Sequence, residues 1–313
     1  MIADRSSSWT HASNRRQFLQ FAVAGGLTLT LGRLPGASAA EPVKRNGKPH
    51  LKLSLAAYSY LDFLTKKENP MHLDDFVRLC ADFNLDGTEL TSYYFPKDFS
   101  EDYLIHLKQL TFRLGLDISG TAIANDFCLP VGPEREKTLA HTRKWIDYAA
   151  LMGAPVIRIF AGNVPKGDSE EAAIARCSAG INEALEYAAR KGVCLALENH
   201  GGITATPEQM LRIIAGVKES PWFGVNLDGG NFHGADPYSE LARIAPYAIN
   251  AQLKTDITPA SGKREDADLE RVVRILADAG YRGYIVLEYE GKEDPKTAVP
   301  RHLDSLRKII RAV

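Results

Sequence analysis

The sequence predicts an α/β chain folded as a single closed (β/α)₈ barrel, and three observations support this prediction. Short apolar runs alternate with amphipathic stretches eight times between residues 51 and 310. About 270 residues remain after an N-terminal leader, which suits one barrel domain, and no Pro- or Ser-rich linker divides them. The main alternative is an open doubly wound sheet, but no G-x-G-x-x-G motif follows the first apolar run.

The first four units each pair a short apolar run with a helical pattern. Asp74 and Asp75 stand in the first turn of the first helix, where acids are stabilising, and Gly192 suits the end of the fourth helix. The expected strand and helix ranges are, in order, 51–58 and 73–83, 87–90 and 101–114, 117–122 and 135–152, and 156–160 and 170–191.

The last four units repeat the pattern. Thr206 and Pro207 supply an N-cap and a first-turn proline to the fifth helix. The expected ranges are 193–198 and 207–217, 222–228 and 237–244, 249–254 and 267–279, and 283–289 and 299–310. Because right-handed crossovers place every helix on one side of the sheet, eight such units close with the strands inside.

The N-terminal segment resembles a twin-arginine export signal. The pair Arg15 and Arg16 precedes an apolar stretch at 21–31 and a run of small residues at 37–40. We therefore expect residues 1–40 to be removed, 41–50 to be a flexible lead-in and 51–313 to be the barrel. The mature chain would then be periplasmic or extracellular, with no stable membrane anchor. The alternative is an ordinary amphipathic helix with two adjacent arginines.

Charge and cysteine content disfavour a nucleic-acid partner and a structural zinc site. Removing residues 1–40 takes away four basic residues and one acid, which changes the formal net charge from −1 to −4. This mildly acidic chain lacks the basic stripe that a nucleic-acid backbone requires. The four cysteines are widely spaced and form no C-x-x-C motif, so we expect buried thiols rather than a zinc site, although export would permit a disulfide.

Three apolar runs in the second half of the chain each end in a carboxylate: Glu198, Asp228 and Glu288. In a barrel the C-terminal ends of the strands meet at one mouth, where catalytic groups lie. With Gln252 on the seventh strand, these residues occupy four successive strands. Their oxygen atoms suit one divalent ion, Mn²⁺ or Mg²⁺, with Zn²⁺ and Co²⁺ left open. The alternative is that these acids pair with neighbouring cations.

Four segments resemble the xylose isomerase-like TIM-barrel superfamily, in particular its sugar phosphate isomerase/epimerase branch, which includes ketose 3-epimerases and, more distantly, endonuclease IV. The segments are 197–200 (LENH), 226–228 (NLD), 251–256 (AQLKTD) and 287–289 (LEY), and the resemblance covers about residues 51 to 310. In that family the matching Glu, Asp, His and Glu bind one divalent ion. The resemblance thus implies Glu198, Asp228 and Glu288 as ligands. Gln252 stands where the epimerases usually have histidine, and it can ligate through its amide oxygen but cannot titrate.

The resemblance implies proton transfer beside a carbonyl group. A metal ion would polarise the carbonyl, while Glu198 and Glu288 would remove and return the proton. Return to the same carbon on the other face gives epimerisation, and return to the neighbouring carbon gives aldose-ketose isomerisation.

Five further polar residues at the strand ends are candidate substrate-binding groups: Glu89, Arg158, His200, His233 and Lys254. Lys254 and Arg158 would hold an oxyanion or hydroxyl, or instead form an ion pair with Glu198 or Asp256. The histidines would orient hydroxyl groups or pack in loops. Glu89 would line the pocket or form a salt bridge across the mouth.

The hypothesis that unites these features is an exported, metal-dependent isomerase or epimerase acting on a free or oxidised sugar. Three alternatives remain: a keto-glycoside lyase that uses the same chemistry, a hydrolase of the endonuclease IV kind, and a non-catalytic carbohydrate-binding barrel. The expected partner is a small sugar, and homo-oligomerisation is left open.

Overall fold

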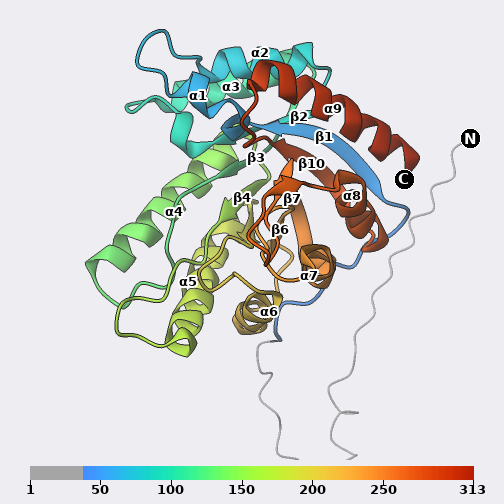
Figure 1. Cartoon of the computed structure of the whole chain (residues 1–313). Coiled ribbons are helices and arrows are strands. Elements are labelled where there is room, and N and C mark those ends of the chain that lie inside the picture. Colours follow the sequence, from blue (N-terminus) through green and yellow to red (C-terminus); the bar gives the residue numbers. More distant parts are fainter. Residues whose placement is uncertain (1–37) are drawn as a thin grey trace, which may run out of the picture. The chain divides into compact units, whose positions relative to one another are not determined.

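Eight parallel strands close into a barrel in the computed structural model, which describes residues 38–313 (Figure 1). Around the barrel the strands follow the order β1-β10-β7-β6-β5-β4-β3-β2. Their bounds are β1 (His50–Ala56), β2 (Gly87–Thr91), β3 (Asp117–Ala122), β4 (Val156–Ile159), β5 (Cys194–Glu198), β6 (Phe223–Asp228), β7 (Ala248–Lys254) and β10 (Arg282–Glu288). The predicted fold class is confirmed.

The helices lie outside the strands (Figure 1). They are α1 (Leu61–Leu64), α2 (Leu73–Asp82), α3 (Glu101–Arg113), α4 (Pro133–Met152), α5 (Glu170–Lys191), α6 (Pro207–Gly216), α7 (Pro237–Ile244), α8 (Leu269–Asp278) and α9 (Pro295–Ala312). Each long helix buries one apolar stripe against the strands. In α8 this stripe includes Leu269, Val272, Val273 and Leu276, at the spacing that puts side chains on one helix face.

Local sequence signals set the first and last residues of several helices. The Thr206 hydroxyl accepts a hydrogen bond from the Gln209 backbone N–H, and the Gln209 side chain accepts one from the Thr206 backbone N–H. This reciprocal pair starts α6. Gly192 ends α5 with a φ of 72°, a left-handed conformation that favours glycine. Helix α9 starts four residues before the expected position, because Asp294 caps it and Pro295 occupies its first turn.

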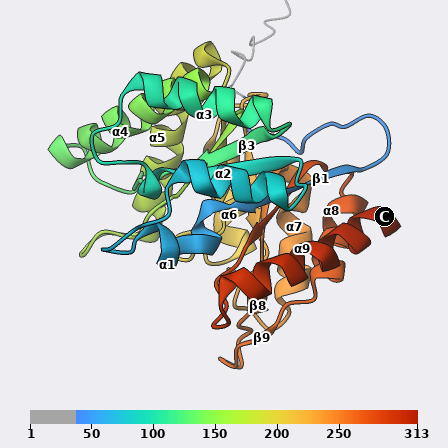
Figure 2. The same cartoon turned by 90° about the horizontal axis from the view of Figure 1, so that it is seen from above.

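Several short elements in the loops were not expected from the sequence. They are the 3₁₀ turns η1 (Ala57–Tyr60), η2 (Ser92–Tyr94) and η3 (Ala245–Tyr247), helix α1 and a small hairpin of β8 (Asp256–Ile257) with β9 (Glu265–Asp266). Figure 2 shows this hairpin projecting from the barrel. Such elements are too short for a hydrophobic pattern to repeat within them, so periodicity cannot reveal them.

The segment that precedes β1 crosses the amino-terminal ends of the strands. Ala39 pairs with Lys218 in an antiparallel bridge, flanked by hydrogen bonds from Glu219 N to Ser38 O (2.8 Å) and from Ala40 N to Val217 O (2.9 Å). Further along, the Val43 N–H donates to Pro246 O at 3.0 Å. Residues 38–43, expected to be the end of a leader and a flexible lead-in, are thus hydrogen-bonded to the barrel. The predicted signal otherwise lies outside the described residues.

The described residues include no helix that is long and apolar enough to cross a membrane. All four cysteines are free thiols, as expected from their spacing. Cys80, Cys128 and Cys177 are buried, whereas Cys194 is only partly buried.

Candidate active site

Three carboxylates converge at the C-terminal mouth of the barrel. Glu198, Asp228 and Glu288 are the last residues of β5, β6 and β10, and their exposed fractions are 2%, 0% and 6%. Strands β5, β6, β7 and β10 are hydrogen-bonded neighbours, as expected for four successive barrel units. Parallel register places these residues side by side, since Asp228 is level with Gln252 and Glu288 is level with Lys254.

The Lys254 side chain lies at the centre of this acidic site. Its Nζ is 2.9 Å from Glu288 Oε2, 3.0 Å from Glu290 Oε1 and 3.3 Å from Asp228 Oδ2. Burial lowers the pKa of Lys254, but Asp228 and Glu288 outweigh that effect and the net pKa is raised well above its ordinary value. Lys254 is therefore a buried ammonium shared by three carboxylates. This agrees with the alternative that the strand-end acids pair with neighbouring cations, although Glu198 and Asp256 were the partners named for Lys254 itself.

Glu198 is held by a second cation and by two amides. Arg158 Nε lies 2.8 Å from Glu198 Oε2, which is one of the two ion pairs considered for Arg158 from the sequence. Asn226 donates to the same oxygen at 3.3 Å, and Asn231 donates to Glu198 Oε1 at 3.1 Å. Both oxygens of Glu198 are thus fixed. In Glu288 only Oε2 is held, because no hydrogen bond from the described residues reaches Oε1.

A layer of amide side chains lies below the carboxylates, inside the barrel. The Gln252 amide donates to Glu89 Oε1, and its carbonyl oxygen accepts from Asn226 at 2.6 Å. Asn250 donates to Glu89 Oε2 at 3.1 Å and to Asn226 Oδ1 at 2.9 Å. The Gln252 side-chain oxygen, which we expected to be a metal ligand, thus points towards Asn226. Asn250 has no counterpart among the residues selected from the sequence.

Glu89 lies inside the barrel and makes no salt bridge across the mouth. It is fully buried, and burial raises its pKa to about 7, although the amides of Gln252 and Asn250 oppose the rise. Burial also raises the pKa of Glu198 and of Asp228, with Arg158 and Lys254 respectively opposing it. These acids therefore hold protons more readily than ordinary carboxyl groups.

The two histidines lie at the edge of the site. His200 is exposed, and its ring packs 4.2 Å from the Phe160 ring. Partial desolvation of the ring and the nearby positive charge of Arg158 lower the pKa of His200, so the ring is neutral near pH 7. His233 is exposed and its Nδ1 bonds to Thr258 O at 2.7 Å, so it supports a loop. Neither ring forms a hydrogen bond to Glu198, Asp228 or Glu288.

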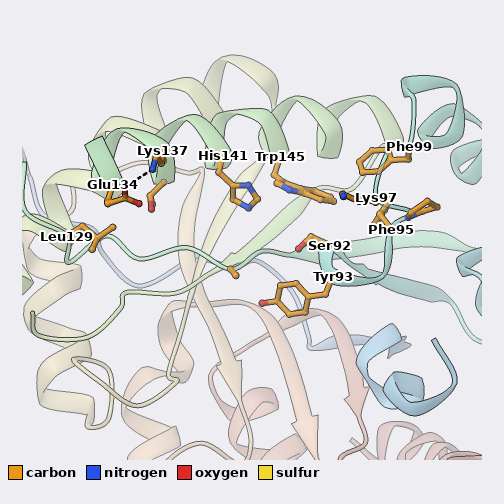
Figure 3. A pocket seen from close by; sticks show the side chains of 13 residues that line it. Ser92, Tyr93, Phe95, Lys97, Phe99, Leu129, Glu134, Lys137, His141 and Trp145 are labelled. Atoms are coloured by element: carbon orange, nitrogen blue, oxygen red, sulfur yellow. Dashed lines mark hydrogen bonds and ion pairs between the residues drawn. The ribbon is translucent and has the colours of Figure 1, made fainter. Parts of the chain in front are cut away.

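Two cavities flank the acidic site. The smaller, of about 190 Å³, lies above β6 and β7, and its lining includes Asn231, His233, Lys254, Arg264 and Glu290. The larger, of about 520 Å³, lies between α4 and the loops that follow β2 and β3 (Figure 3). Tyr93 lines this second cavity, and its hydroxyl is 3.4 Å from both terminal nitrogens of Arg158. The second cavity therefore adjoins the Arg158–Glu198 pair.

The side chains of the mouth fit a divalent cation in their chemistry. Asp228 Oδ2 is buried and accepts no hydrogen bond from the part of the chain that the structure describes, because the Lys254 contact at 3.3 Å lacks hydrogen-bond geometry. Together with Glu198 and Glu288 it offers the oxygen donors that Mg²⁺ and Mn²⁺ prefer. Within residues 38–313, however, no three His, Cys, Asp or Glu side chains converge as a preformed metal cluster. Lys254 separates the carboxylates, so an ion would have to replace its ammonium.

The family model described as xylose isomerase-like TIM barrel matches residues 77–309. The chain belongs to this family. The match includes β5, β6, β7 and β10, and hence all four strands that carry the acidic site. This confirms the resemblance inferred from the four strand-end segments.

Curated relatives and solved structures agree with this assignment. The chain is 25% identical over 243 residues to the L-ribulose-5-phosphate 3-epimerase of Shigella flexneri, which covers 74% of this chain and 83% of that relative. The prediction of an isomerase-like enzyme agrees with such relatives.

Two solved structures share the fold. The D-psicose 3-epimerase of Clostridium cellulolyticum H10, solved with D-tagatose, has a TM-score of 0.66 and 15% identity, covering 84% of this chain and 99% of that one. A xylose isomerase-like TIM barrel protein of Mycobacterium smegmatis, solved with magnesium, has a TM-score of 0.63 and 19% identity, covering 83% and 97%.

Proposed function

We propose that this protein is a sugar isomerase or epimerase that moves a proton at a carbon next to a carbonyl group. The observation that supports this most directly is the pair Glu198 and Glu288, which enter one buried mouth from β5 and β10. Two carboxyl groups on either side of a bound sugar can remove a proton from one face and return it to the other. The relationship to an L-ribulose-5-phosphate 3-epimerase supports the same chemistry.

The hydrogen bonds of the two acids suggest a division of roles. Glu288 Oε1 carries no hydrogen bond from the described residues, so it is free to accept the substrate proton. Glu198 is held at both oxygens by Asn231, Asn226 and Arg158, which fixes its direction towards the mouth. We assign Glu288 to proton removal and Glu198 to proton return, with the roles exchanged in the reverse reaction. Arg158 also offers positive charge to a substrate oxygen.

A divalent ion belongs to this proposal. Glu198, Asp228 and Glu288 would hold it, and it would supply Lewis-acid polarisation of the substrate carbonyl. Gln252 would join them only if its amide oxygen turned away from Asn226. The Lys254 ammonium would then lie beside Glu290, at the edge of the smaller cavity, where it can donate to a sugar hydroxyl.

Solvent exchange tests the proposal. The protein is loaded with Mn²⁺ or Mg²⁺ and incubated in D₂O with ketoses and keto-glycosides, and NMR follows deuterium incorporation beside the carbonyl. We expect exchange in the wild type and a decrease of about 10²- to 10⁴-fold in Glu198→Gln and Glu288→Gln. The control is Glu186→Gln, a change at a surface ion pair.

Two results would contradict this function. Absence of exchange with every sugar would leave a binding protein, whereas exchange at an unchanged rate in both variants would show that Glu198 and Glu288 do not move the proton. Release of the aglycone as a free alcohol, together with formation of an unsaturated keto-sugar, would instead identify the lyase reaction.

Export by the twin-arginine route is a second part of the proposal, supported by Arg15, Arg16 and the small residues at 37–40. Export suits a free or oxidised sugar better than a sugar phosphate, which is mainly a cytoplasmic metabolite. A fusion to a reporter that folds before export would be recovered outside the cytoplasm, and changing both arginines to lysine would retain it inside. Export of the changed form at an equal rate would reject the route.

A further inference from the structure

The larger cavity has the lining of a sugar-binding subsite. One stripe of α4 faces it, formed by Glu134, Thr138, His141 and Trp145, at spacings that bring side chains to one face of a helix (Figure 3). Opposite lie side chains of the loop after β2, including Ser92, Tyr93, Lys97 and Phe99. Aromatic rings and hydrogen-bonding groups therefore face each other across one space.

The aromatic part of this lining is rigid. Trp145 packs against Phe95 with ring centres 5.3 Å apart and against Phe99 at 6.1 Å, and Phe95 and Phe99 are 5.0 Å apart. Trp145 and Phe95 are nearly buried, which fixes their orientation. Tyr93 is 42% exposed and presents its ring to the cavity. The exposed face of Tyr93 suits the apolar C–H surface of a pyranose ring.

The polar part supplies hydrogen-bonding groups and one ammonium group, that of Lys97, which is not paired with an acid of the described residues. Glu134 and Lys137 pair with each other at 2.6 Å, so they nearly neutralise each other. Among residues 38–313, Lys97 forms no ion pair, and the Thr138 hydroxyl forms no hydrogen bond to another side chain. Hydroxyl groups of a neutral sugar match these donors and acceptors. The volume of about 520 Å³ falls in the range of small-molecule sites.

The position of the cavity sets what it would bind. Tyr93 stands between the cavity and Arg158, and Arg158 contacts the proposed catalytic Glu198. A substrate whose first sugar ring lies over Glu198 and Glu288 could therefore extend past Tyr93. Its second ring, linked through a glycosidic oxygen, would contact α4. We propose that the cavity beside α4 is a second saccharide subsite and that the substrate is a keto-disaccharide or other glycoside. This inference rests on the proposed function and narrows its substrate class.

A filled-cavity variant tests the subsite. Thr138→Phe places a ring in the cavity, whereas Ala140→Phe adds the same ring to exposed α4 surface about 200° around the helix. The probes are glucose and four disaccharides (cellobiose, maltose, lactose and trehalose), with binding measured by calorimetry. We expect the wild type and Ala140→Phe to bind at least one disaccharide about tenfold more tightly than glucose, since stacking on aromatic rings contributes at this level. Thr138→Phe should lose that preference and keep glucose binding.

Three outcomes overturn the inference. The first is equal binding of glucose and all four disaccharides by the wild type. The second is a disaccharide preference that survives in Thr138→Phe. The third is a dimer that dissociates in Thr138→Phe but not in Ala140→Phe, seen by light scattering, which would assign the cavity to a second copy of this chain. The proposed chemistry is tested separately. If the protein prefers disaccharides but shows no solvent exchange, the subsite is supported and the isomerase function is rejected.

Discussion

At the residue scale, Lys254 determines the state of the acidic site. It is the one cation within 3.3 Å of Asp228, Glu288 and Glu290 in the described part of the chain. A buried ion cluster that loses one partner leaves the remaining charges uncompensated, which is more costly than loss of a surface pair. The same ammonium stands where a divalent ion would bind, so Lys254 and the metal compete.

Lys254→Met tests this competition. We expect the variant without metal to lose about 3 kcal/mol of unfolding free energy in urea with EDTA present, because three carboxylates lose their cation. Addition of Mn²⁺ should then stabilise the variant more than the wild type, since no ammonium has to be displaced.

Lys218→Met is the matched control, because Lys218 pairs with Glu186 on the surface at 3.0 Å. It should change stability by less than about 1 kcal/mol. An equal Mn²⁺ effect in Lys254→Met and in the wild type would show that Lys254 does not occupy the metal position.

The sequence could reveal the acids and the pairing of Glu198 with Arg158, but not the other partners. Glu198, Asp228 and Glu288 each end an apolar run, so periodicity alone located them. The contacts of Lys254, Asn250 and Gln252 depend on strand register around a closed barrel and on side-chain rotamers. No local pattern encodes these features. Glu290 follows β10 by two residues and was missed for the same reason.

At the element scale, α2 and α3 are joined by a polar contact outside the site. Asp74 in the first turn of α2 accepts a hydrogen bond from Tyr103 Oη at 2.8 Å and contacts His106 Nε2. Burial raises the pKa of Asp74, but the hydrogen bonds from His106 and Tyr103 outweigh it, and the net pKa is lowered. The folded state therefore binds this proton less tightly than the unfolded state does.

A lowered folded-state pKa gives a definite pH dependence. The contact stabilises the fold above the unfolded pKa of about 4, and this stability is lost as the pH falls through the folded pKa. Asp74→Asn should be less stable than the wild type by about 1 to 2 kcal/mol near neutral pH, and the difference should shrink in acid.

Urea unfolding at about pH 5.5 and about pH 2.5 measures this difference. The control is Asp82→Asn, an exposed position on the same helix. A stability difference that is the same at both pH values would mean that ionised Asp74 contributes nothing to the junction of α2 and α3.

The helices and strands of the barrel were more predictable than the loops. β3, α5 and α7 have the bounds expected from periodicity and caps, whereas the β8–β9 hairpin does not follow from any pattern. Long elements carry several turns of hydrophobic repeat, and each further turn strengthens the signal. The cavity beside α4 could not be predicted, since it arises where a face of α4 meets the loop that precedes this helix and the loop that follows β2.

At the scale of the whole molecule, the segment before β1 is tied to the far end of the barrel. Ser38 and Ala40 hydrogen-bond to Glu219 and Val217, on the end opposite the acidic site. A chain that begins at Glu41 loses both bonds. We expect it to be less stable than a chain that begins at Ala37 by about 1 to 2 kcal/mol in urea unfolding. Equal stability would show that this pairing adds nothing to the barrel.

The antiparallel bridge between Ala39 and Lys218 has a consequence for maturation. If the small residues at 37–40 are cut by a signal peptidase, the protease must bind them as an extended strand, and β-type recognition uses the same backbone groups that pair with residues 217–219. Cleavage at 37–40 and pairing of this segment with residues 217–219 then exclude each other. A protein that crosses the membrane already folded would be cleaved only when this pairing opens. The opening equilibrium of the bridge would therefore limit the rate at which the mature enzyme is released.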